Sequence, residues 1–180
     1  MSEKDNKNRI DIKKMSGSER EVLGAVVGLA KTCGNNPYTD DTIRLICDTL
    51  LELKVRCAVG GQTAEGGKDF DDDCDAAGLI EQLHAEKYRI SPGCAVCRSR
   101  CGNTDDYDIA LILDEEPEKL QIKEELIYYA FELAKAVHND SVGYSDDGYR
   151  LVLVGVLTVL SYDMSVKGLE NVLEQAKRQL

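Results

Sequence analysis

Apolar residues recur at intervals of three and four along most of the chain, which is the spacing of one face of an α-helix. Strands would instead show alternation of apolar and polar residues. We therefore expect an all-α protein, a helical bundle of five to seven helices that forms a single domain over residues 16–180. Residues 1–15 carry almost no recurring apolar side chains and are expected to form a flexible N-terminal tail.

Capping and chain-breaking residues set the expected bounds of the helices. Ser16 or Ser18 suits the start of the first helix, because a glutamate follows each of them at the third position, and Pro117 suits the first turn of another. Residues 146–161 are apolar almost all round, which favours a central helix, although their valines also fit a buried strand. The expected helices are residues 16–34, 39–60, 74–88, 105–113, 117–138, 146–161 and 165–178.

The charge of the chain excludes several classes of partner. A formal net charge of −11 repels phosphate backbones, so we expect no nucleic acid partner, and anionic membrane surfaces are disfavoured for the same reason. The longest apolar run, residues 151–160, is too short to span a bilayer. The polar N-terminus does not resemble a secretory signal, so we expect no membrane association and a cytoplasmic location.

Cysteine usage supports a reducing compartment. Seven cysteines cannot all pair within one chain, so they are expected to serve as core residues or metal ligands. The densest group is the run Cys94-Ala-Val-Cys97-Arg-Ser-Arg-Cys101, which places three thiols within eight residues. Pro92-Gly93 precedes this run and Gly102-Asn103 follows it, so we expect a cysteine-rich loop that links two helices.

Metal binding is the favoured role of this loop. Short spacings in a loop let several sulfurs converge on one centre, and a two-residue gap is common in both zinc and iron–sulfur sites. Arg98 and Arg100 would stabilise thiolates or an anionic cluster. We therefore predict that Cys94, Cys97 and Cys101 bind an iron–sulfur cluster or zinc.

Two alternative roles of these cysteines stay open: they form a redox disulfide, or they are free thiols with no function. A structural zinc site needs four protein ligands, so a fourth would have to come from Cys57, Cys74, a carboxylate or a partner chain, unless the position is open. Cys33 and Cys47 lie in apolar stretches of expected helices and are predicted to be core residues. A structural role is also favoured for Cys57 and Cys74.

The remaining ionisable residues are expected to be solvent-exposed or structural. The carboxylate-rich stretches 103–118 and 69–75 are expected to be solvated. In the first stretch, some of the carboxylates are expected to lie at a helix N-terminus, where the helix dipole favours negative charge. His84 shares an apolar helix face and is expected to pack in the core or at its rim, whereas His138 lies near a helix C-terminus. No side chain stands out as a catalytic nucleophile.

From the cysteine loop onward the chain resembles the hybrid-cluster proteins, also known as prismane proteins and hydroxylamine reductases. The likeness covers about residues 94–178 and corresponds to the helical N-terminal part of that family. The family motif has four cysteines at wider spacing, and its catalytic cluster is held by later domains for which this chain shows no counterpart. The residues that carry the likeness are Cys101-Gly102, Leu120-Gln121, Leu126-Ile127-Tyr128 and the run from Leu157 to Asp163.

Two classes of function follow. The first is a small metal–sulfur protein that acts in electron transfer or reductive nitrogen metabolism with a redox partner protein; the resemblance implies an oxidoreductase similar to hydroxylamine reductase. The second is a non-enzymatic helical interaction module whose cysteines are structural or free. A homodimer is expected only because most soluble oligomers are symmetric dimers.

Overall fold

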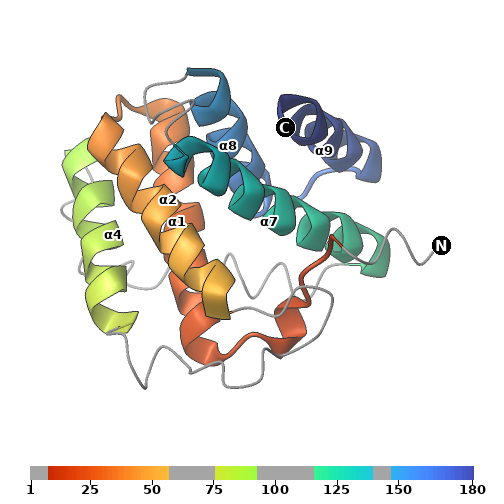
Figure 1. Cartoon of the computed structure of the whole chain (residues 1–180), viewed down its shortest axis with the longest axis horizontal. Coiled ribbons are helices and arrows are strands. Elements are labelled where there is room, and N and C mark those ends of the chain that lie inside the picture. The colour runs from red at the N-terminus through yellow and green to blue at the C-terminus, as the bar shows by residue number, and fades with distance from the viewer. Residues whose placement is uncertain (1–7, 57–75, 93–115, 140–146) are drawn as a thin grey trace.

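The computed structural model describes residues 8–56, 76–92, 116–139 and 147–180 (Figure 1). Within these ranges every regular element is helical, which confirms the predicted all-α fold. A short 3₁₀ turn, η1 (Ile12–Lys14), comes before the first helix. The α-helices are α1 (Gly17–Asn35), α2 (Asp40–Arg56), α4 (Ala76–Ile90), α7 (Pro117–His138), α8 (Asp147–Val159) and α9 (Val166–Gln179). The short helix expected over residues 105–113 lies outside the described residues.

Four of the helices form a closed ring. α1 packs against α2 and α8, and α7 packs against the same two helices from the other side. The other two described helices extend this ring, because α4 packs mainly on α1 whereas α9 packs on α7 and α8 (Figure 1). α7 is therefore part of the ring, whereas α4 packs outside it on α1. In sequence these two helices flank the cysteine loop.

The core is mainly aliphatic and extends from the ring helices to α4, α9 and the N-terminal residues. Phe131 of α7 is one of its largest fully buried side chains, and leucine, isoleucine and valine fill most of the space around it. Each helix contributes residues at the three- and four-residue spacing seen in the sequence, so burial of that apolar face holds the helices together. Among the described helices, none is long and apolar enough to cross a membrane.

The segment 146–161 is helical over Asp147–Val159, so the alternative of a buried strand is wrong. Its helix is also less enclosed than its composition suggests. Leu153 is fully buried in the core, whereas Leu151 is 66% exposed. Residues two apart point to different sides of a helix and to the same side of a strand, which is why these two leucines differ so strongly in exposure.

Local capping explains where two helices begin. Ser16 Oγ accepts the Glu19 N–H at 3.2 Å, while the Glu19 carboxylate accepts the Ser16 N–H at 2.9 Å. This reciprocal pair is the capping box that the sequence allowed at either Ser16 or Ser18, and the structure places it at Ser16. Pro117 occupies the first turn of α7 as expected, because an N–H at that position has no hydrogen-bond partner within the helix.

The N-terminal segment differs from the expectation of a flexible tail over residues 1–15. Residues 8–15 lie against the bundle, where Ile10 and Ile12 are fully buried and Met15 is nearly so. The sequence shows no helical period here because these residues form no α-helix, and a short segment with one 3₁₀ turn buries its side chains without such a period. Residues 1–7 lie outside the described part of the chain.

A buried lysine ties α7 to the end of α8. The Lys123 side chain is only 1% exposed, and its ammonium donates a hydrogen bond to the backbone oxygen of Tyr162 at 3.1 Å. One turn earlier in α7, Lys119 pairs with Asp163 at 2.9 Å. Both cations lie at the C-terminal side of α8, where the helix dipole favours positive charge.

Candidate functional site

The predicted metal ligands Cys94, Cys97 and Cys101 lie outside the described residues, as do Cys57 and Cys74. The structure describes the two helices that flank these cysteines in sequence. α4 ends at Ile90, and α7 begins at Pro117. Within residues 8–56, 76–92, 116–139 and 147–180, no three His, Cys, Asp or Glu side chains are grouped so that they could hold a metal ion.

The two described cysteines are core residues, as the sequence predicted. Cys33 on α1 and Cys47 on α2 are both free thiols and both buried. Burial raises the pKa of each thiol to about 12, with added effects of Glu86 on Cys33 and of Asp48 on Cys47. These thiols are therefore protonated at neutral pH, and protonated thiols are neither nucleophiles nor metal ligands.

The last turn of α4 is attached to the start of α2 by a polar cluster. Glu86 accepts a hydrogen bond from the Thr42 hydroxyl and forms an ion pair with Arg89, whose Nη2 lies 2.5 Å from the Glu86 carboxylate. The same nitrogen of Arg89 donates to the hydroxyls of Thr39 at 3.3 Å and Thr42 at 3.2 Å. This Thr39–Thr42–Glu86–Arg89 cluster holds the end of the helix that leads into the cysteine loop, since Cys94 is only four residues beyond Ile90.

The cluster stabilises the ionised form of Glu86. The hydrogen bond from Arg89 lowers the pKa of Glu86 below its usual value, the Thr42 hydroxyl acts in the same direction, and partial burial opposes both. The sequence shows the Glu86–Arg89 pair at a spacing of three residues in a helix. It does not reveal the Thr42 partner, which lies 44 residues away in the chain.

A lowered pKa makes the stability contributed by Glu86 depend on pH. A carboxylate with a depressed folded-state pKa stabilises the fold above its unfolded pKa, and this contribution is lost as pH falls through the folded pKa. We expect Glu86→Gln to destabilise the protein by about 1–2 kcal/mol at neutral pH, below the usual value for a hydrogen bond to a charged group because solvent screens the half-exposed Arg89. The difference from wild type should shrink as the pH is lowered below about 4, near the usual carboxyl range.

Denaturant unfolding of both proteins between neutral and acidic pH measures this difference. Glu81→Gln is the control, because Glu81 lies exposed on the same helix. A Glu86→Gln variant whose deficit does not vary with pH would contradict the assignment.

The histidines and the described carboxylates occupy places consistent with their assigned roles. His84 is half-buried on α4, and His138 is exposed at the end of α7, with its Nδ1 3.8 Å from Asp48 of α2. Of the carboxylate-rich stretch 103–118, only its last residues are described, and Glu118 lies exposed in the first turn of α7. The stretch 69–75 lies outside the described residues.

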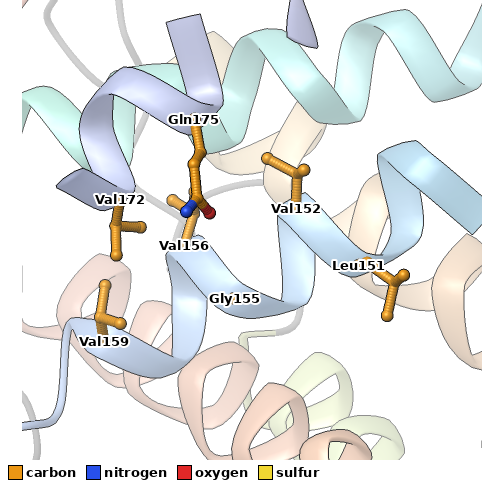
Figure 2. A pocket seen from close by; sticks show the side chains of 7 residues that line it. All are labelled: Leu151, Val152, Gly155, Val156, Val159, Val172 and Gln175. Atoms are coloured by element: carbon orange, nitrogen blue, oxygen red, sulfur yellow. The ribbon is translucent and has the colours of Figure 1, made fainter. Parts of the chain in front are cut away.

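A shallow apolar groove lies between α8 and α9 (Figure 2), and no motif in the sequence predicted it. Its volume of about 180 Å³ is below that of a typical small-molecule site. It contains no ionisable side chain, so it offers apolar contact and one amide rather than catalysis. In the sequence, only the spacing of small and β-branched residues along α8 indicates this groove. The groove is lined by Leu151, Val152, Gly155, Val156, Val159, Val172 and Gln175.

Comparison of the chain with models of protein families, with curated proteins and with solved structures found no match. Among the residues of the chain, the cysteine run at residues 94–101 is the pattern that most specifically indicates a chemistry.

Proposed function

We propose that the protein is a helical metal–sulfur protein in which Cys94, Cys97 and Cys101 bind one iron–sulfur cluster or one zinc ion. The observation that carries the proposal is the placement of three thiols within eight residues between Pro92-Gly93 and Gly102-Asn103. Thiolates in such a run can reach one centre without displacing a helix, because a loop has backbone freedom that a helix lacks.

The described fold supports this proposal indirectly. Cys33 and Cys47 are buried and protonated, so they do not compete as thiolates. In sequence the loop lies between α4, which packs on α1, and α7, which is part of the ring, and the polar cluster around Glu86 holds the end of α4. A metal site built between two packed helices needs less ordering of the chain on binding than one in an unfolded chain.

Electron transfer or an accessory role in reductive nitrogen metabolism is the proposed activity. An iron–sulfur cluster carries single electrons, and the positive charges of Arg98 and Arg100 would offset the negative charge of its thiolates. The net charge of −11 would steer a redox partner that presents a basic surface. A cytoplasmic location suits the thiols, because that compartment keeps them reduced. Hydroxylamine reductase activity is a separate proposal that rests on the resemblance to hybrid-cluster proteins alone.

Purification without oxygen tests the metal proposal. We expect a brown protein with visible absorbance and stoichiometric iron and sulfide, or a colourless protein with one zinc per chain. Zinc alone would favour the helical interaction module over electron transfer. Only traces of either metal after anaerobic reconstitution, with all three loop thiols freely alkylated, would refute metal binding.

A further inference from the structure

Residues 8–15, called here the N-terminal strap, connect α7 to α1 (Figure 1). On the α7 side, the buried carboxylate of Glu124 lies 3.0 Å from the Arg9 guanidinium and accepts the Ile12 N–H at 3.4 Å. On the α1 side, Arg20 donates to the backbone oxygens of Ile12 at 3.3 Å and Lys13 at 2.9 Å. The strap is thus held from both sides by side chains of the helices.

Much of the strap's own hydrogen bonding is local. The Lys13 N–H donates to the Asp11 carboxylate, the Lys14 N–H to the Asp11 backbone oxygen, and the Met15 N–H to the Ile12 oxygen. These bonds do not involve any backbone group of α1 or α7. Release of the strap would therefore leave the backbone hydrogen bonds of both helices intact.

We propose that the N-terminal strap is a detachable element that opens without unfolding of the helices, and that Glu124 is the residue that holds it closed. Burial of Ile10, Ile12 and Met15 favours the closed strap. The entropy cost of ordering eight backbone residues opposes it by a similar amount, so opening requires much less free energy than unfolding of the bundle.

The buried charge of Glu124 also affects the equilibrium between the closed and the open strap. Burial raises the pKa of Glu124, and Arg9 and the Ile12 N–H offset that effect in part. Exposure to water on opening relieves this cost of burying the carboxylate. Opening would uncover the Glu124 carboxylate together with the apolar surface that the two isoleucines cover in the closed strap.

Native-state hydrogen exchange on the full chain tests the proposal. The amides of Ile12 and Met15 should exchange through an opening that is nearly independent of denaturant at low concentration. The amides of Leu126 and Ile127, in the middle of α7, should exchange only through a larger opening that denaturant strongly favours. Exchange of both groups at one rate, with one denaturant dependence, would overturn the proposal.

Adjacent glutamates on α7 provide a matched pair of variants. Glu124→Ala should accelerate exchange at Ile12 and Met15 by about tenfold relative to Leu126, because it removes the acceptor of the Ile12 N–H and the partner of Arg9. Glu125 instead pairs with Lys177 of α9 at 3.3 Å, so Glu125→Ala should leave strap exchange unchanged. Glu124→Gln retains the acceptor and should restore much of the protection. Equal effects of the two alanine variants on the strap would show that Glu124 does not hold it.

Discussion

Replacement of any one of Cys94, Cys97 and Cys101 by serine is expected to remove most of the bound metal. Three ligands from one short loop act as a unit, so the loss of one thiolate weakens the site by a large factor, and the remaining two do not retain the metal through purification. Metal analysis of the three anaerobically purified variants should show similar losses, and an iron–sulfur protein should lose its visible absorbance in parallel.

Cys33→Ser and Cys47→Ser are the controls for this series. Both thiols are buried in the helical core, so serine there places a hydroxyl group in an apolar environment and lowers stability by about 1–3 kcal/mol. Their metal content should equal that of wild type. Single changes of Asp105 or Asp106 to asparagine should also have little effect on metal content. A loop variant that retains its metal would remove that cysteine from the proposed ligand set.

Leu153→Ala is expected to destabilise the fold by about 2–5 kcal/mol, the usual cost of a cavity left by a fully buried leucine. Leu151→Ala, two residues earlier on the same helix, should change stability by less than about 0.5 kcal/mol, because that side chain is largely exposed. Denaturant unfolding measured for both variants gives the comparison directly.

The pair also tests the helical register of α8. In a strand the two leucines would share one face, and both changes would be costly or both harmless. Similar losses of stability at the two positions would therefore contradict the orientation of α8 in the bundle.

Local sequence signals predicted most of the helices because their causes are local. The capping residues Ser16 and Pro117 and the apolar spacing of α1, α7 and α9 depend on neighbours within a turn or two. The same reasoning identified Cys33 and Cys47 as core residues, since thiols in an apolar helical stretch are usually packed. The candidate metal site was likewise predicted from spacing alone, and its three cysteines lie outside the described residues, so it stays a prediction.

Contacts between distant residues were not predictable in this way. The N-terminal strap carries no helical period, and its Ile12 N–H bonds to Glu124, which lies 112 residues away in the chain. The link from Thr42 to Glu86 and the buried position of Lys123 are of the same kind. Each depends on which helix faces meet in the folded ring, and that pairing arises from the combined packing of all the helices.

The sequence by itself thus determined the helical class of this protein and the identity of most described helices, because periodicity and caps act over a few residues. It also predicts one segment with ligand chemistry, from thiol spacing. The tertiary structure alone decided that α1, α2, α7 and α8 close a ring, that Leu151 faces outward while Leu153 faces inward, and that residues 8–15 pack against the bundle. These outcomes follow from burial of apolar surface, which is non-directional and depends on surfaces that come together only when the chain folds.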